Sequence, residues 1–226
     1  MTDVLERLRG GLVVSCQPVD DGPMNRPEIV TAMAQAAVAG GAVGLRIEGV
    51  NNLKAARLLV NVPIIGIVKT DSRDTPVRIT VSRTDVSALV ASGADIVAYD
   101  ATDRPRKNSR AEILNSILAK GAIAMADCST LNDAHVAQTG GATILGTTLS
   151  GYTSATAKQG EKPNIELVRQ FSALKAFVMA EGRFNTPELA TEAIIAGADC
   201  VTVGSALTRL ELMTACFAKA VMGPKR

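Results

Sequence analysis

The sequence predicts an α/β protein that folds as a single (β/α)8 TIM barrel over residues 1–226. Three observations lead to this prediction. Eight short apolar segments of strand length alternate with segments of helical spacing, which is the pattern of a parallel sheet. Small-residue hinges recur before every second strand, which favours a closed barrel over an open sheet. The chain length also lies near the lower end of the range for one such barrel.

The predicted strands are short runs of Val, Ile, Leu and Ala, and only 3% of the residues are aromatic. This composition is typical of a parallel sheet that is covered on both faces. In chain order the strands are Leu12–Ser15, Val43–Ile47, Ile64–Val68, Ile96–Tyr99, Ile123–Ala126, Thr143–Gly146, Ala176–Ala180 and Cys200–Val203. Apolar residues at helical spacing predict the helices between and after them. These helices are Pro27–Ala39, Leu53–Leu59, Arg83–Ala91, Arg110–Ala119, Asn132–Gln138, Asn164–Leu174, Pro187–Ala196 and Leu210–Val221.

The four hinges share a glycine at the point where a helix ends and a buried strand begins. Glycine most readily takes the left-handed conformation of such a connection. The hinges lie at residues 39–42, 92–95, 139–142 and 196–199, so successive copies are offset by 53, 47 and 57 residues. A doubly wound sheet gives no reason for this period, whereas a barrel assembled from four quarters does.

The composition excludes several classes of protein. A net charge of +2, from 24 basic and 22 acidic residues, provides no long-range field that would gather nucleic acid or an anionic membrane. No window approaches the roughly 18 apolar residues of a membrane span, and the first apolar run is too short for a secretory signal. The four cysteines are scattered without a C-x-x-C pair, so we expect neither a zinc site nor disulfides. We therefore expect a cytoplasmic protein with reduced cysteines.

A (β/α)8 barrel forms its site at the C-terminal ends of the strands, so the polar residues that follow each apolar run are the candidates. Nearly every predicted strand supplies an ionisable or hydrogen-bonding group at this end. In chain order these groups are Ser15 and Gln17, Arg46 and Glu48, Lys69 and Asp71, Asp100 and Thr102, Asp127 and Ser129, Thr147 and Thr148, Glu181 and Arg183, and Ser205.

The ends of the last two strands predict a phosphate-binding site. Glu181–Arg183 and Gly204–Ser205 fall where such barrels commonly bind phosphate. Glycine lets backbone N–H groups approach phosphate oxygens, and a short helix after the eighth strand would point its positive end at them. Arg183 or Arg209 would complete the charge. The alternative is that Gly204 forms only a tight turn and that both arginines are surface residues.

Lys69 is the strongest candidate for acid–base or nucleophilic chemistry. It follows the run Ile64–Val68, which is apolar enough to be buried on both faces, so its ammonium group would be partly desolvated. Desolvation lowers the pKa of a lysine toward a value useful for proton transfer or for attack on a carbonyl. The alternative is a structural ion pair with Asp71, Asp100 or Asp127.

The remaining ionisable residues suggest acid–base chemistry without a cofactor. Asp127 and Glu181 are each either a second acid or base, or the counter-ion of Arg46 or Lys69. The only histidine, His135, falls on a predicted helix away from the mouth, and metal-site histidines come in groups. The sequence has neither a Walker A loop nor a G-x-G-x-x-G after a strand. We therefore expect no metal and no nucleotide cofactor.

Nine blocks of sequence resemble the N-acetylmannosamine-6-phosphate 2-epimerases of bacterial sialic acid catabolism. One such block is weakly specific, but all nine in order along one barrel are strongly so. The blocks are Gly11–Gln17, Gly44–Arg46, Gly66–Lys69, Asp100–Thr102, Met125–Thr130, Gly146–Thr153, Ala180–Arg183, Thr186–Glu188 and Val203–Arg209. The resemblance is less close at Arg78–Val81, Arg104–Lys107 and Leu210–Glu211, where rim contacts with the substrate are expected to vary.

The resemblance implies a barrel of the ribulose-phosphate-binding type that interconverts N-acetylmannosamine 6-phosphate and N-acetylglucosamine 6-phosphate without a cofactor. Carried over by position, Lys69 is implied as the acid or base at the C2 proton, with Glu181 as its partner. The residues implied to hold the sugar and to stabilise the enolate-like intermediate are Gln17, Arg46 and Asp127. The residues implied at the phosphate end are Gly182, Arg183, Gly204, Ser205 and Arg209.

Two other functions fit the same residues. An aldolase or ring-forming synthase, in which Lys69 forms a Schiff base with a sugar phosphate, would use a desolvated lysine equally well. A non-catalytic sugar-phosphate sensor would keep Gly204 and Arg209 for binding. A sensor would not need Lys69, Asp127 and Glu181 to converge on one mouth, so we favour an enzyme.

The expected partners are a small sugar phosphate and a second copy of the chain. The last predicted helix, Leu210–Val221, is apolar enough to form a homodimer interface. It also fits the ordinary last helix of a barrel, and the sequence does not decide between the two.

Overall fold

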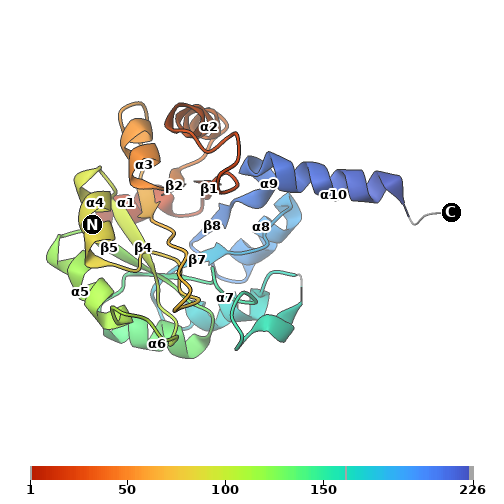
Figure 1. The fold of residues 1–226 in the computed structure, drawn as a ribbon. Helices are drawn as coiled ribbons and strands as arrows, with labels where there is room; N and C mark the ends of the chain where they lie inside the picture. Colours follow the sequence, from red (N-terminus) through yellow and green to blue (C-terminus); the bar gives the residue numbers. More distant parts are fainter. Residues whose placement is uncertain (1, 161, 224–226) are drawn as a thin grey trace.

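The computed structural model describes residues 2–160 and 162–223. Its eight strands are parallel, pair in chain order, and close into a barrel through contact of the eighth with the first (Figure 1). The predicted fold is therefore confirmed. The strands are β1 (Leu12–Cys16), β2 (Gly44–Glu48), β3 (Ile64–Ile67), β4 (Ile96–Asp100), β5 (Ile123–Asp127), β6 (Ile144–Gly146), β7 (Phe177–Glu181) and β8 (Cys200–Val203).

The helices surround the barrel and agree with the predicted segments to within a few residues. Most begin at a Ser, Thr or Asn whose side chain accepts a hydrogen bond from the first turn. They are α2 (Pro27–Ala39), α3 (Val50–Arg57), α4 (Arg83–Ala91), α5 (Arg110–Ala119), α6 (Leu131–Thr139), α7 (Ile165–Ser172) and α8 (Pro187–Ile195). The sequence did not predict α1 (Thr2–Leu8) or the short 3-10 helix η1 (Ala157–Gln159).

The glycine hinges adopt the predicted backbone conformation. One glycine of each hinge has a φ angle between +95° and +103°, in the left-handed region that side chains avoid; these residues are Gly41, Gly93, Gly141 and Gly197. Each hinge therefore turns a helix end directly into an even-numbered strand. The quarter-barrel period in the sequence corresponds to this repeated connection.

The core has an inner and an outer layer. One buried cluster fills the barrel interior with alternate residues of the strands, and a second lies between the strands and the surrounding helices. Helix α1 closes the N-terminal opening, because its Leu8 is fully buried in the inner cluster. The C-terminal opening is left for polar side chains.

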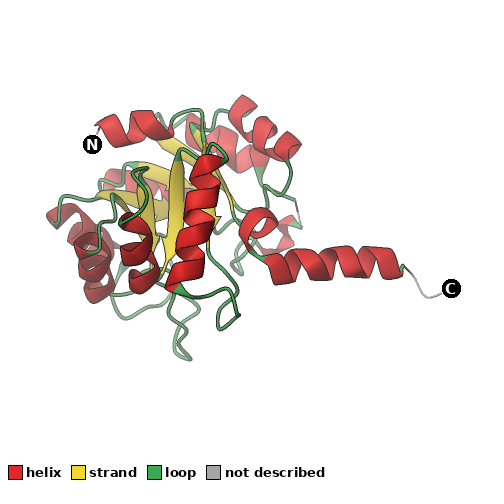
Figure 2. Ribbon diagram, turned by 90° about the horizontal axis from the view of Figure 1, so that it is seen from above, coloured by secondary structure: helices red, strands yellow, loops and turns green. Residues whose placement is uncertain are grey.

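The chain after β8 departs from the ordinary barrel pattern. A single turn, α9 (Ser205–Thr208), is followed by α10 (Leu210–Met222), which extends away from the barrel in both views (Figures 1 and 2). All thirteen residues of α10 belong to the described part of the chain, and none of them is buried. The alternative that this segment is the ordinary last helix of the barrel is therefore wrong.

Within residues 2–160 and 162–223, the structure contains no helix that is long and apolar enough to cross a membrane.

Candidate active site

A cavity of about 420 Å³ opens at the C-terminal ends of the strands. Nine of the ten residues predicted for the site line this cavity: Gln17, Arg46, Lys69, Glu181, Gly182, Arg183, Gly204, Ser205 and Arg209. The tenth, Asp127, is fully buried beneath the cavity, where it contacts Arg46. The structure thus brings the predicted residues together, with Asp127 buried in the floor of the cavity.

Alternation along the strands explains why these side chains meet. Lys69, Asp127 and Glu181 each stand two residues beyond a side chain of the inner cluster. Because successive side chains of a strand point to opposite faces, all three continue the interior face of the barrel. Strands β5 and β7 each extend one residue beyond the predicted apolar run, so each of them ends on an acidic residue.

The floor of the cavity is a cluster of one guanidinium and two carboxyl groups. Arg46 is 1% exposed, and its Nη2 lies 2.6 Å from Oδ2 of Asp127 while its Nη1 lies 3.2 Å from Oε2 of Glu181. Burial alone would lower the pKa of Arg46, but the two carboxyl groups raise it above its ordinary value. Asp127 and Glu181 are therefore both counter-ions of Arg46, as one interpretation of the sequence proposed.

Glu181 differs from its neighbour Asp127 in its access to the cavity. Burial raises the pKa of Glu181 to about 7; the charge of Arg46 opposes this rise and the charge of Asp127 adds to it. Its side chain is 13% exposed and lines the cavity. Glu181 is thus a carboxyl group that can gain and lose a proton near neutral pH in contact with a ligand.

Lys69 lies half-buried in the wall opposite Glu181, and no carboxylate among the described residues forms an ion pair with it. None of the ion pairs among the described residues includes it. The three acids that could have paired with it bind arginines instead: Asp71 pairs with Arg78, Asp100 with Arg104 and Arg106, and Asp127 with Arg46. Burial and the nearby charge of Arg209 lower the pKa of Lys69 to about 8. The structural ion-pair interpretation is therefore wrong.

Lys69 sits on a segment that leaves β3 and returns beside it, here called the Lys69 arm (residues 68–80). Its two sides pair through an antiparallel bridge between Lys69 and Ile79 and through a 2.7 Å bond from Thr80 N to Val68 O. The returning side inserts between β3 and β4, since Thr80 Oγ1 donates to Ala98 O at 2.7 Å. Thr80 has a φ angle of +46°, which is uncommon for a β-branched residue. The arm thus fixes the backbone that carries the lysine.

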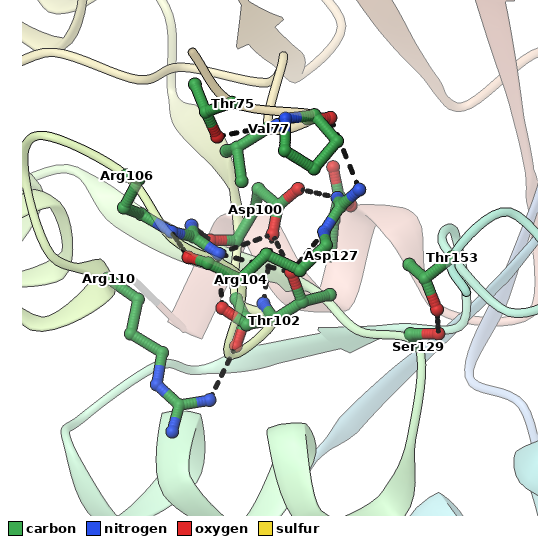
Figure 3. A network of polar contacts seen from close by, with 12 residues as sticks. Thr75, Val77, Asp100, Thr102, Arg104, Arg106, Arg110, Asp127, Ser129 and Thr153 are labelled. Carbon is green, nitrogen blue, oxygen red and sulfur yellow. Dashed lines mark hydrogen bonds and ion pairs between the residues drawn. The ribbon is translucent and has the colours of Figure 1, made fainter. Parts of the chain in front are cut away.

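A network around Asp100 ties the tip of the Lys69 arm to the end of β4 (Figure 3). Asp100 is 1% exposed and accepts hydrogen bonds from Arg104 and Arg106. Arg104 Nη1 also donates to Pro76 O at 3.2 Å, and Thr75 Oγ1 donates to a main-chain oxygen of the same β4 loop at 2.5 Å. The buried carboxylate therefore anchors two arginines, one of which holds the arm.

The phosphate end predicted from the sequence contains two arginines with fixed positions. Arg183 donates to Ser150 O at 3.2 Å and to Gly151 O at 3.0 Å, and its guanidinium lies 4.2 Å from the ring centre of Tyr152. Arg209 Nε donates to Gln17 O at 3.0 Å. Because α9 is a single turn, its dipole adds little attraction for an anion, so the arginines must supply the charge.

Several residues that line the cavity lie outside the predicted site. Thr148 and Asp100 follow or end strands as polar residues, but their roles depend on contacts across the barrel, which the sequence does not show. Arg78 and Arg104 follow no strand directly and reach the cavity only because the Lys69 arm and the β4 loop fold over its edge. Thr202 lies inside β8, and only its strand parity could have indicated that it faces the cavity.

Residues 30–223 match the model of a family described as "Putative N-acetylmannosamine-6-phosphate epimerase". A Haemophilus influenzae protein named "Putative N-acetylmannosamine-6-phosphate 2-epimerase" is 55% identical over 219 residues, covering 97% of this chain and 95% of that protein. A Photobacterium profundum protein of the same name is 54% identical over 215 residues, covering 95% of this chain and 91% of that protein.

A solved structure, the N-acetylmannosamine-6-phosphate 2-epimerase from Clostridium perfringens, superimposes with a TM-score of 0.91 at 37% identity. The match covers 95% of this chain and 94% of that one. The thiamine phosphate pyrophosphorylase from Pyrococcus furiosus, with a TM-score of 0.63 at 20% identity, shares the fold alone. With the matched family model and relatives covering nearly the whole chain, this protein belongs to the N-acetylmannosamine-6-phosphate epimerase family.

Proposed function

We propose that the protein interconverts N-acetylmannosamine 6-phosphate and N-acetylglucosamine 6-phosphate by removing and returning the proton at C2. The observation that supports this most strongly is the pair of groups facing the cavity. A lysine with a pKa of about 8, which forms no ion pair within the described part of the chain, stands across from a glutamic acid with a pKa of about 7. Both groups can exchange protons at neutral pH, as general acid–base catalysis requires.

The ring order of the strands supports proton exchange on two faces of the sugar. Lys69 follows β3 and Glu181 ends β7, and these strands are four places apart in a closed ring of eight. The two side chains therefore approach the cavity from opposite walls. A substrate held between them presents one face of C2 to the lysine and the other to the glutamic acid. Removal on one face and return on the other inverts C2.

Lys69 and Glu181 together hold the same number of protons before and after one turnover. With Lys69 neutral and Glu181 protonated, the lysine takes the C2 proton and the carboxyl group gives its proton to the opposite face. The enzyme is left with a charged lysine and an ionised Glu181, which is the state that converts the other epimer. The active pair therefore always holds one proton, and neither direction needs a metal or a nucleotide.

Arg46 stabilises the intermediate through its charge. Removal of the C2 proton spreads negative charge toward the C1 oxygen of the ring-opened sugar, and a fixed positive charge beneath the site lowers the energy of that state. Nη1 and Nη2 of Arg46 already contact carboxyl groups, so we assign its contribution to its fixed charge. Its buried Nε has no hydrogen-bond partner among the described residues. Asp127 keeps this guanidinium in place from below, and Gln17, with Ser15, lines the wall beside it.

Proton NMR of N-acetylmannosamine 6-phosphate with the purified protein in deuterated water tests the reaction. We expect deuterium at C2 and the appearance of N-acetylglucosamine 6-phosphate without added metal or nucleotide. Lys69→Ala should abolish both while retaining phosphate-dependent binding of the substrate. Absence of both exchange and product with the unmodified protein would refute the proposal, and retained activity in the variant would refute the role of Lys69.

Borohydride treatment separates this proposal from a Schiff-base aldolase. An epimerase that moves a proton forms no covalent bond to Lys69, so we expect no mass increase on the peptide that contains it. A trapped adduct at Lys69 would favour the aldolase. Binding of the sugar phosphate without C2 exchange would favour a sensor.

We also propose that two copies of the chain form a homodimer through α10. Short isolated helices are marginal in water, yet α10 has only two charged residues and exposes apolar ones: Leu210, Leu212, Phe217, Val221 and Met222. This helix extends away from the barrel (Figures 1 and 2), and none of its residues is buried. A two-fold arrangement in which each α10 packs on the other copy satisfies both chains at once.

Sedimentation velocity tests the dimer. The unmodified protein should sediment as a dimer, and Phe217→Asp should shift it to the monomer because a charge replaces an apolar contact of α10. Val136→Asp is the matched control, since Val136 is an exposed apolar residue on α6. A monomeric unmodified protein, or an equal effect of both substitutions, would contradict the proposal.

We assign the protein to the cytoplasm. All four cysteines are free, and Cys216 is exposed on α10. An exposed free thiol is typical of a reducing compartment. Fractionation of the cells that produce the protein should recover it with cytoplasmic marker enzymes, and recovery outside the cytoplasm would contradict the assignment.

A further inference from the structure

Thr148 connects the two carboxyl groups of the cavity floor. Its Oγ1 lies 2.7 Å from Oδ1 of Asp127 and 3.3 Å from Oε2 of Glu181. A hydroxyl group has one hydrogen, so it can donate to only one of the two carboxyl groups at a time. Which one receives the bond depends on which of them carries a proton.

Glu181 is the member of this pair that changes its protonation state. The charged or titratable groups facing it are Arg46 from β2, Lys69 beyond β3 and Asp127 from β5. Asp127 is fully buried and accepts hydrogen bonds from both terminal nitrogens of Arg46. Glu181 is partly exposed to the cavity, and its Oε2 lies 3.2 Å from Nη1 of the same guanidinium.

We propose that Thr148 is a positioning residue whose hydroxyl holds the Glu181 carboxyl group and reverses its hydrogen bond as Glu181 gains and loses the catalytic proton. When Glu181 is protonated, it donates to Thr148 Oγ1, and Thr148 donates to Asp127. When Glu181 is ionised, Thr148 donates to Glu181 instead. The hydroxyl keeps its own hydrogen throughout, so no proton passes through it. This inference rests on the proposed function for its catalytic part.

The neighbouring Thr147 secures the main chain at the same place. Thr147 Oγ1 donates to Glu181 O at 2.8 Å and accepts from Glu181 N at 3.0 Å. The end of β7 is therefore held independently of Thr148. Loss of the Thr148 hydroxyl should alter the orientation and proton affinity of the Glu181 carboxyl group without displacing the strand.

Thr148→Val removes the hydroxyl and keeps the branched shape of the side chain. Because the bond from Thr148 favours the ionised form of Glu181, the acidic limb of the pH profile of kcat should move up by roughly half to one pH unit. We expect kcat to fall about tenfold or more, with KM changed by less than about threefold. Thr148→Ser, which retains the hydroxyl, should restore both the limb and most of kcat. Thr143→Val, at the opposite end of β6, should match the unmodified protein.

The carboxyl carbon of Glu181, observed by carbon-13 NMR and assigned with Glu181→Gln, gives a readout that does not depend on turnover. Its titration should move upward in Thr148→Val and return in Thr148→Ser. Unchanged titration in Thr148→Val, or an equal shift in Thr148→Ser, would overturn the inference. Failure of the proposed function would instead appear as absent C2 exchange in the unmodified protein, with the titration result unaffected.

Discussion

Replacement of Glu181 by Gln should remove a loss of stability that the unmodified protein undergoes as the pH rises from about 4.5 to about 7. A carboxyl group whose pKa rises from 4.5 in the unfolded chain to about 7 in the fold is stabilising only while protonated. Its contribution is complete below about pH 4.5 and is lost as the pH rises through about 7. Gln keeps the shape of the side chain but has no proton to lose, so this loss should disappear.

The magnitude follows from the two pKa values. Between about pH 5.5 and pH 8, linkage predicts that the free energy of unfolding of Glu181→Gln gains about 2 kcal/mol relative to the unmodified protein. Urea unfolding of both proteins at the two pH values and one protein concentration measures this difference. Glu192→Gln, which removes an exposed carboxyl group of α8, is the control and should show little change with pH. If the free energies of unfolding of the unmodified protein and Glu181→Gln differ by the same amount at both pH values, the reasoning is refuted.

Three further outcomes follow from the site. Because the form of Lys69 and Glu181 that holds one proton is the active one, kcat/KM should be bell-shaped with limbs near pH 7 and 8, and a flat profile across this range would count against the pair. In Gly151→Ala, the new Cβ would lie 2.0 Å from Nη1 of Arg183, so displacement of that guanidinium should raise KM roughly tenfold with little change in kcat. In Arg104→Ala, the Lys69 arm loses the hydrogen bond that anchors it, so kcat should fall about a hundredfold in steady-state kinetics. Inhibition by inorganic phosphate should be unchanged. Weaker phosphate inhibition would instead place Arg104 at the phosphate end.

The sequence predicted the barrel because its signals are local. Helical spacing, apolar runs and the glycine hinges each depend on residues close together in the chain, and the even strands begin within one residue of the predicted positions. Lys69, Arg46 and Glu181 could be identified for the same reason, since the fold requires strand ends to meet at one mouth.

The remaining features depend on contacts between distant segments. Helix α10 has the spacing of an ordinary barrel helix, and only its packing distinguishes an extended position from a docked one. The burial of Asp127 beneath Arg46, rather than at the surface of the cavity, is set by the length of the arginine side chain across the barrel. The Lys69 arm depends on Thr80 in an uncommon backbone conformation, for which the sequence carries no glycine as a signal.

Because the Lys69 arm inserts between β3 and β4, the backbone pairing of these two strands is shorter than that of any other neighbouring pair in the barrel. Strands β3 and β4 pair at two positions, whereas β4 and β5 pair at five. Backbone amides between β3 and β4 are therefore protected from hydrogen exchange partly by the arm rather than by a continuous ladder of strand pairing. Local opening should begin here, so amide hydrogen exchange should be faster at residues 68–80 than along β5. The lysine is thus carried by the part of the ring that opens most readily, while the acid opposite it stands on a strand held along its length.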